Sequence, residues 1–319
     1  MAVLGFDTSN YTTSIACFDG VGGENCSRLL PVKAGELGLR QSDAVFHHTK
    51  SLPELSDRLF SHLNGLPIDA VGVSTRPRAM EGSYMPCFLV GYSHAKLLAD
   101  CLGVPLYSCS HQQGHIAAAL WSAGALPLMD EPHLAWHLSG GTTELLLVEP
   151  ERKNVRCRRI GGTTDISAGQ LIDRTGQRLS LAFPAGKALD ALSRDAGSQD
   201  FFRVKCPGTE FSLSGMENKM QAYASENSPE DTASFVLRTV AQAVFQATLN
   251  AQKAYPGLCV VFSGGVASNS MLRKLMEPLQ PVFAQPQYST DNAMGVAVLA
   301  HRLLEDANGT ECIIHHPGQ

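Results

Sequence analysis

Short apolar runs, each followed by small polar residues, recur along the chain and predict strands that end in tight turns. The first strand, 3–7, leads through a polar turn into a second strand at 12–18. The same order returns at 134–138 and 143–148, on either side of a Ser-Gly-Gly-Thr turn at 139–142. Two halves that open in the same way predict a duplicated α/β architecture.

Apolar residues three and four positions apart predict the helices. Helices are expected at 42–63, 90–102, 112–122, 232–253 and 271–276, and further strands at 70–75, 104–109, and 258–262. Ser42 is the expected N-cap of the first helix. Because strands and helices alternate in both halves, we expect an N-terminal lobe over residues 1–128 and a C-terminal lobe over residues 129–319.

Composition supports two sizeable cores and narrows the class of protein. The chain has 319 residues, of which 44% are hydrophobic and 17% charged, so two domains are expected. Nine cysteines without a C-x-x-C pair favour reduced thiols and a cytoplasmic location. We expect neither a secretory leader nor a membrane-spanning segment. The net charge of −5 gives no global attraction to nucleic acid.

The small-residue turns after strands are candidates for phosphate binding. Glycines and hydroxyl residues let backbone N–H groups converge on phosphate oxygens. The turns at 139–142 and 263–269 have this composition. The first of them corresponds in position to the polar turn after the strand 3–7 in the other half. A single turn of this kind is more often an ordinary tight turn, so the prediction of nucleotide binding depends on the repetition of such turns.

Histidines supply the candidate metal site. His111 and His115 are four positions apart, which places both imidazoles on one face of a helix. His137 and Asp291 are expected at other strand ends, and the four side chains would form a site for zinc or iron(II). A structural histidine pair is the alternative. Gln112 follows the first histidine where a metalloprotease of the H-E-x-x-H type needs a glutamate, so that class is disfavoured.

These motifs together resemble the tRNA threonylcarbamoyladenosine synthase family, also known as the glycoprotease or O-sialoglycoprotein endopeptidase family. The resemblance runs from Gly5-Phe6-Asp7-Thr8-Ser9 to Thr290-Asp291-Asn292-Ala293. Its most specific parts are His111-x3-His115, Ser139-Gly140-Gly141, the stretch 169–186 and the stretch 264–273. The resemblance implies a two-lobed fold like that of actin, the heat-shock ATPases and the sugar kinases, with nucleotide bound between the lobes.

The resemblance also implies roles for individual residues. His111, His115 and Asp291 would bind the metal, and His137 falls where some relatives place a tyrosine ligand. The nucleotide-binding residues would be Ser139, Gly140, Gly141, Asp173, Gly186, Asp190, Gly265 and Asn269. The implied reaction transfers a threonylcarbamoyl group from its adenylate to N6 of an adenine in tRNA, with one iron or zinc ion polarising the carbonyl as a Lewis acid. ATP or AMP is the alternative bound nucleotide.

Several residues near the implied site depart from the family pattern. Tyr11 and Thr12 stand where the synthases usually carry two acidic residues, one of them expected to matter for catalysis. We therefore assign the catalytic positions to Asp7 and Thr12. Arg76-Pro77-Arg78 replaces a usual Gly-Pro-Gly loop, and either arginine is suited to bind a phosphate or carboxylate or to form a surface ion pair. Glu217 replaces a lysine.

The departures leave three functions to separate. The first is a metal-dependent acyltransferase, with tRNA as its acceptor and a homodimer or helper proteins as its partners. The second is a catalytically reduced nucleotide-binding subunit that serves as a scaffold or dimer partner. The third is an actin-like kinase or ATPase, in which Asp7 would position Mg²⁺ or activate a hydroxyl group. A bound transition metal favours the first function, because a kinase has no need for the histidines.

Overall fold

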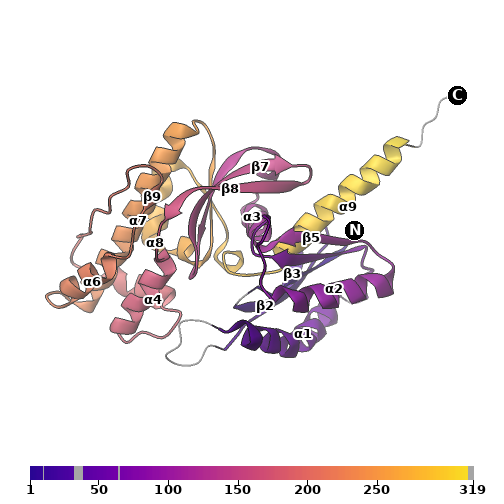
Figure 1. The fold of residues 1–319 in the computed structure, drawn as a ribbon, viewed down its shortest axis with the longest axis horizontal. Helices are drawn as coiled ribbons and strands as arrows, with labels where there is room; N and C mark the ends of the chain where they lie inside the picture. The colour runs from indigo at the N-terminus through magenta and orange to yellow at the C-terminus, as the bar shows by residue number, and fades with distance from the viewer. Residues whose placement is uncertain (10, 32–38, 64, 315–319) are drawn as a thin grey trace. The chain divides into compact units, whose positions relative to one another are not determined.

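The computed structural model describes residues 1–9, 11–31, 39–63 and 65–314 (Figure 1). The chain forms two compact units. The first unit contains residues 1–131, 149–157 and 291–319, and the second contains residues 132–148 and 158–290. The division of the lobes between residues 128 and 129 stays a prediction.

A five-stranded sheet forms the centre of the first unit, with the order β3-β2-β1-β4-β5. Its strands are β1 (Val3–Asp7), β2 (Thr12–Phe18), β3 (Gly23–Leu29), β4 (Ala70–Arg76) and β5 (Leu106–Ser110). The first three strands are antiparallel neighbours, whereas β1, β4 and β5 run parallel. The carboxyl ends of β1, β4 and β5 therefore lie at the same end of the sheet, where the helix that follows β5 begins.

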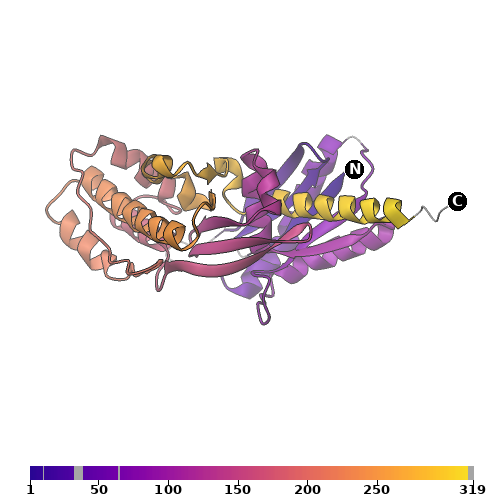
Figure 2. The same cartoon turned by 90° about the horizontal axis from the view of Figure 1, so that it is seen from above.

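Helices cover both faces of this sheet because β1 is apolar on both sides. Leu4 and Phe6 share a core with α1 (Gln41–Leu63) and α2 (Phe88–Leu102). Val3 shares a smaller core with Ala300 of the last helix, α9 (Met294–Ile314). Figure 2 shows α9 lying along the strands, with its last turns extending beyond them. The alternation along β1 places Asp7, at the strand end, on the α9 side.

A second sheet, most of which belongs to the second unit, repeats this topology. It has the order β11-β10-β6-β7-β8-β9. The strands are β6 (His133–Leu138), β7 (Thr143–Glu151), β8 (Asn154–Thr163), β9 (Glu210–Phe211), β10 (Val260–Ser263) and β11 (Val282–Phe283). As in the first sheet, the opening strand pairs antiparallel with the next strand and parallel with a later one. The predicted duplicated α/β fold is confirmed.

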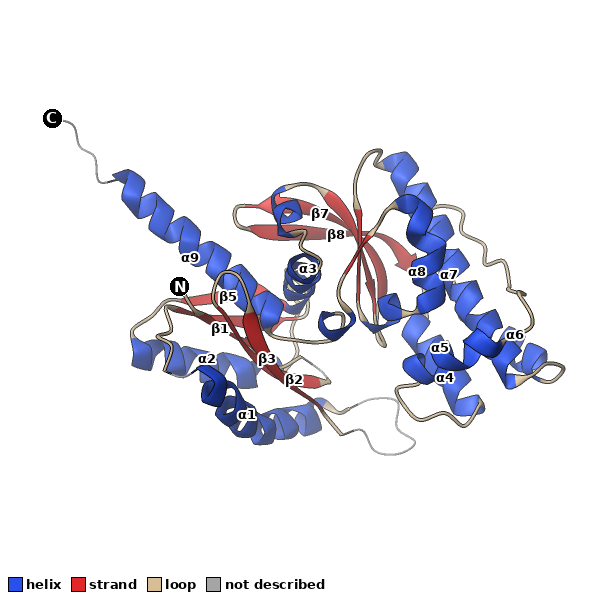
Figure 3. Cartoon of the chain, turned by 180° about the vertical axis from the view of Figure 1, so that it is seen from behind, coloured by secondary structure: helices blue, strands red, loops and turns tan. Residues whose placement is uncertain are grey.

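Helices of the second unit pack on a core centred on β6. These are α4 (Ala168–Arg178), α5 (Gly186–Leu192), α6 (Met216–Ala224), α7 (Pro229–Ala254) and α8 (Ser270–Met276), and Figure 3 shows them grouped beside the sheet. Leu134, Trp136 and Leu138 of β6 are fully buried against α7. The indole Nε1–H of Trp136 donates a hydrogen bond of 2.9 Å to Thr248 Oγ1, which satisfies its polar group in the core.

The predicted elements are found within a few residues of their expected bounds, with one error in capping. The first helix begins at Gln41, so Ser42 lies inside its first turn and is not the N-cap. The apolar periodicity fixed the buried face of this helix but carried no information on its first turn. Within the described part of the chain, every helix is too short or too polar to cross a membrane.

Candidate metal centre

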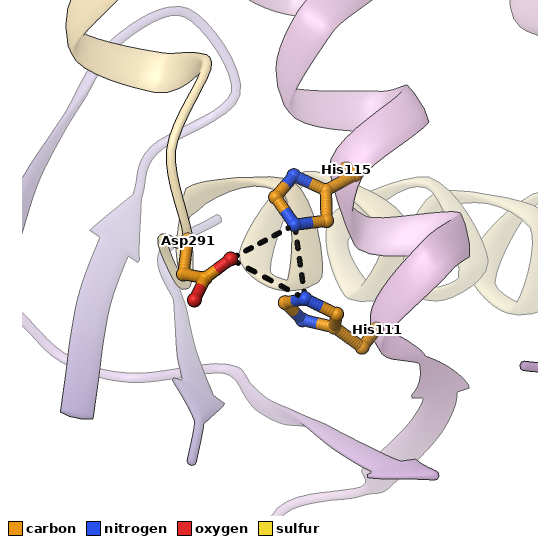
Figure 4. A group of neighbouring side chains, drawn as sticks. All are labelled: His111, His115 and Asp291. Carbon is orange, nitrogen blue, oxygen red and sulfur yellow. Dashed lines mark hydrogen bonds and ion pairs between the residues drawn. The ribbon is translucent and has the colours of Figure 1, made fainter. Parts of the chain in front are cut away.

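Three predicted ligands meet in the first unit, where they point toward one another (Figure 4). His115 Nε2 lies 2.9 Å from His111 Nε2 and 3.2 Å from Asp291 Oδ1, and His111 Nε2 lies 3.5 Å from the same carboxylate oxygen. His111 and His115 belong to α3 (His111–Ser122), and Asp291 precedes α9. Residues 176 positions apart are thus brought to one point by the fold.

The start of α3 is held by a capping box, which fixes the direction of both histidines. Ser110 Oγ accepts a hydrogen bond of 3.2 Å from Gln113 N, and Gln113 Oε1 accepts one of 2.9 Å from Ser110 N. These reciprocal bonds satisfy two backbone donors at the helix start. Gln113 Nε2 also donates a hydrogen bond of 2.6 Å to Val155 O, so both the oxygen and the nitrogen of this side-chain amide are hydrogen-bonded.

Asp7 lies behind His111. Its Oδ2 is 2.7 Å from His111 Nδ1, and its Oδ1 accepts hydrogen bonds from Ser74 Oγ at 2.8 Å and Ser9 N at 3.0 Å. The carboxylate is only 1% exposed. Because the Nδ1–H group of His111 donates its hydrogen bond to Asp7, the Nε2 atom of His111 is left facing His115 and Asp291.

The buried charges hold the cluster in one arrangement. Burial lowers the pKa of His111, but the Asp7 and Asp291 carboxylates outweigh this effect and raise it to about 10. Burial and the charge of His111 both lower the pKa of His115. Burial raises the pKa of Asp291, but its hydrogen bonds and charge interactions with the two histidines hold it well below its usual range. The cluster is therefore a site for positive charge.

The donor atoms fit a transition metal. Two imidazole nitrogens and one carboxylate oxygen lie within 4.8 Å of one another. Two histidines and a carboxylate suit zinc and non-haem iron(II), and a carboxylate behind a ligating histidine is the usual outer partner. The side chains of His115, His111 and Asp291 are 3%, 18% and 25% exposed, so the cluster is open on one side.

A close helix crossing fixes the distance between the histidines and Asp291. A Cβ atom added at Gly295, in the first turn of α9, would lie 1.9 Å from Gly114 O of α3. Because that neighbour is backbone, it cannot swing away, and only glycine permits this approach. Gly295 and Ser74 were not predicted as site residues, because their roles depend on a helix crossing and a strand pairing that leave no local pattern in the sequence.

The predicted ligand His137 and the predicted catalytic residue Thr12 are not part of this cluster. His137, at the end of β6 in the second unit, has its Nδ1 3.4 Å from Ser263 Oγ. Thr12 is buried at the start of β2, and its backbone N–H donates to Ser9 O over 3.4 Å. A ligand role for His137 and a catalytic role for Thr12 stay predictions.

The predicted phosphate turn is shaped by the start of α4. Ser139 Oγ accepts a hydrogen bond of 3.1 Å from Thr142 N, and Ser167 Oγ donates one of 2.6 Å to Gly140 O. A Cβ atom at Gly140 or Gly141 would meet no atom within 4 Å, so both glycines face open space. The turn therefore has exposed backbone beside a helix N-terminus.

Two of the remaining predicted nucleotide residues, Asp190 and Asn269, are joined by a hydrogen bond. Asp190 Oδ1 accepts from Asn269 Nδ2 at 2.6 Å and from the backbone and hydroxyl of Ser270, both at 2.9 Å. Asn269 Oδ1 caps α8 through Leu272 N. Asp190 and Asn269 thus hold α8 in place, while Gly265 opens the short helix before it.

Asp173 and Glu217 lie on neighbouring helices of the same unit. Asp173 Oδ1 accepts a hydrogen bond of 2.8 Å from Ala185 N, just before Gly186 opens α5, and burial raises the pKa of Asp173. Glu217, where the family resemblance implies a lysine, forms an ion pair of 2.6 Å with Arg174 on α4. The altered charge at Glu217 thus has a partner in this chain.

The fold and the site together define a class of protein. The duplicated α/β units have the fold of the actin-like ATPases and kinases, here with a two-histidine, one-carboxylate cluster. The chain is similar to full-length HypF in its phosphate- and nucleotide-bound form (TM-score 0.58, 16% identity, 95% of this chain and 46% of that chain). It is also similar to the ROK hexokinase of Thermus thermophilus (TM-score 0.52, 15% identity, 96% of this chain and 100% of that chain).

Sequence comparison identifies the family within this class. The family TsaD, tRNA N6-adenosine threonylcarbamoyltransferase, matches residues 36–298. A tRNA N6-adenosine threonylcarbamoyltransferase from Thermosipho africanus is 30% identical over 323 aligned positions, covering 95% of this chain and 94% of the relative. The chain belongs to the tRNA N6-adenosine threonylcarbamoyltransferase family, which confirms the resemblance seen in its motifs.

Proposed function

We propose that this chain is a metal-dependent acyltransferase that moves a threonylcarbamoyl, or related carbamoyl, group from an adenylate to N6 of an adenine in tRNA. Membership of the family supports the transferase class and the tRNA acceptor. The observation that carries the metal-dependent reaction is the convergence of His111, His115 and Asp291, with Asp7 behind His111. Peptidase chemistry has no support from these residues, because Gln112 cannot act as a general base.

In this proposal, residues of the first unit hold and orient the metal. His111, His115 and Asp291 would bind one zinc or iron(II) ion, which would supply Lewis-acid polarisation of the transferred carbonyl. The hydrogen bond to Asp7 keeps the proton of His111 on Nδ1, so the Nε2 atom of His111 is available as a ligand atom. The buried position of Asp7 favours this orienting role over direct contact with substrate.

Residues of the second unit would bind the adenylate. The exposed backbone of Gly140 and Gly141 and the hydroxyl of Ser139 would face its phosphate. Asp173 retains one carboxylate oxygen beyond its bond to Ala185, and this oxygen would accept hydrogen bonds from the ribose hydroxyls. Asp190 and Asn269 would support the pocket through α8.

A second candidate is a nucleotide-binding subunit without its own transfer activity. Tyr11 and Thr12 favour it, because neither side chain can replace an acidic group as a base at neutral pH. Such a subunit would bind adenine nucleotide and a partner of the tRNA-modification system. The intact histidine and aspartate cluster favours the transferase instead.

Native mass spectrometry combined with a tRNA transfer assay tests the proposal. The purified protein should carry one zinc- or iron-sized mass and gain a second mass on addition of the adenylate. His111→Ala should lose both the metal and transfer to tRNA, whereas His62→Ala, at an exposed histidine of α1, should lose neither. A folded protein that binds nucleotide but neither a transition metal nor a transferable group would contradict the proposal and favour the subunit.

A further inference from the structure

The segment that follows β4 lies directly beside the start of α3. In the pairing of β4 with β5, Arg76 lies opposite Ser110, the residue immediately before His111. The Pro77 carbonyl accepts a hydrogen bond of 3.0 Å from Gln112 N. Arg76 and Pro77 are therefore bound to the same turn of backbone that begins the metal-binding helix, and all these residues belong to the first unit.

The backbone at Arg76 is shaped by an irregularity and by the proline that follows. The register of β4 and β5 shifts between Ser74 and Arg76, so Thr75 is an extra residue in the ladder. Such a bulge re-aims the next side chain, and bulges are frequent beside active sites. Pro77 restricts the preceding residue to extended backbone, which limits the positions open to the Arg76 side chain.

The two arginines of this segment differ in their environment. Arg76 is exposed, and across the described ranges its guanidinium makes neither an ion pair nor a hydrogen bond. Glu81, the acidic residue of the same loop, is also exposed, and within the described part of the chain it forms no ion pair with Arg76. Arg78 is half-buried and already takes part in interactions, and its backbone N–H donates to Ser83 Oγ over 2.9 Å.

We propose that Arg76 is an anion-binding residue of the transfer site, where its guanidinium binds the oxyanion of the acyl donor. The inference rests on the proposed function, since that function places a donor beside the cluster. A planar guanidinium matches both carboxylate and phosphate through two parallel hydrogen bonds. The donor carries both groups: a carboxylate on its acyl part and a phosphate on its nucleotide.

Two small probes and three variants test the proposal without tRNA. The probes are N-carbamoyl-L-threonine, which has a carboxylate and no phosphate, and AMP, which has a phosphate and no acyl group. Their affinities for the purified zinc-loaded protein are measured by calorimetry. Arg76→Gln removes the charge, Arg76→Lys keeps the charge without the planar fork, and Arg152→Gln removes the same charge at an exposed turn between β7 and β8.

Arg76→Gln should bind one probe about 10- to 100-fold more weakly, as expected for loss of a charge-assisted pair. Arg76→Lys should fall between this variant and the wild type, and Arg152→Gln should stay within about twofold of the wild type. Loss confined to N-carbamoyl-L-threonine assigns Arg76 to the carboxylate, and loss confined to AMP assigns it to the phosphate. Unchanged affinity for both probes, or an equal loss in Arg152→Gln, would overturn the proposal.

The result is independent of transfer activity. If the wild type fails to modify tRNA but Arg76→Gln still weakens one probe, the proposed function is wrong and the anion site stands. If transfer occurs but Arg76→Gln binds both probes normally, the function stands and the anion site is wrong. Circular dichroism and the melting temperature should match the wild type in all three variants, because the altered side chains are exposed.

Discussion

Asp7 influences the candidate metal centre through a single histidine. It contacts Nδ1 of His111 and is itself held by Ser74 and Ser9, so its position is fixed from two sides. A carboxylate in this place orients the imidazole and increases its basicity as a ligand. The sequence predicted Asp7 as a candidate catalytic residue, and that role stays a prediction; its contact with His111 supports the positioning role that we propose for it.

Asp7→Asn should lower the affinity for zinc by about 10- to 100-fold while leaving the fold intact, since outer-shell partners of metal ligands have effects of this size. Competition with a chromogenic chelator measures the affinity. Asp100→Asn, at an exposed residue paired with Lys96, is the matched control. Equal affinity in the Asp7 variant and the wild type would show that His111 does not depend on Asp7 for its orientation.

His48 is a buried neutral histidine that should make stability depend on pH. Its Nδ1 lies 2.8 Å from Thr13 Oγ1, and burial lowers the pKa of His48 to about 4. Between about pH 6.5 and pH 4, the unfolded chain binds a proton at this residue that the folded chain does not. The free energy of unfolding should therefore fall as the pH falls through this window.

The decrease in the free energy of unfolding caused by His48 should reach about 3 kcal/mol at pH 4, because the pKa of His48 is about 2.5 units lower in the folded chain than in the unfolded chain. Urea unfolding between pH 4 and pH 7 measures it, and the slope against pH matters more than the absolute stability. His48→Gln should flatten this slope, whereas His62→Gln, at an exposed position, should not. An unchanged slope in His48→Gln would mean that another group binds the proton.

At the scale of elements, the crossing of α3 and α9 connects packing with the metal centre. α3 carries both histidines, and α9 begins just after Asp291. Their backbones approach at Gly114 and Gly295 more closely than any side chain allows. The distance from Asp291 to the histidines therefore depends on this contact as well as on the ligands.

Gly295→Ala should destabilise the protein by about 1–3 kcal/mol or more, because the added methyl group meets the Gly114 carbonyl. The gain of about 1 kcal/mol in helix propensity does not offset this clash. The variant should also bind metal more weakly. Gly215→Ala, whose Cβ atom would enter open space, should change stability by less than about 0.5 kcal/mol. Wild-type stability in Gly295→Ala, measured by urea unfolding, would show that the helices can move apart at little cost.

At the scale of the whole molecule, the metal ligands come together only in the folded chain. Asp291 follows His111 by 180 positions in the sequence, and Asp7 precedes His111 by 104 positions. A metal that binds this cluster therefore binds the native state in preference to the unfolded chain. Stability and metal binding are linked by mass action.

Zinc at about 100 times its dissociation constant should stabilise the native state by about 2.7 kcal/mol and raise the melting temperature by several degrees. Differential scanning fluorimetry with added zinc measures the shift. His111→Ala should remove most of it, and the shift that persists in this variant accounts for zinc bound elsewhere, including by the nine cysteines. An equal shift in His111→Ala and the wild type would place the zinc at another site.

The sequence by itself determined the duplicated α/β fold and the histidine motif. Strands and amphipathic helices have short periods, so the pattern within 10 to 20 residues is enough to predict them. Four-residue spacing on a helix likewise places His111 beside His115 without further information. The prediction that Ser42 caps the first helix was wrong, because capping depends on one residue's backbone and not on a repeated pattern.

The tertiary structure decided how distant residues combine. It brought Asp291 to the histidines, placed Asp7 behind His111 and set Arg76 opposite Ser110, and none of these contacts has a local signal in sequence. Their geometry depends on strand order and on the close crossing at Gly114 and Gly295. The candidate site residues could be named from the sequence, but which of them lie close enough to share one site depends on the packing of the sheet and helices around them.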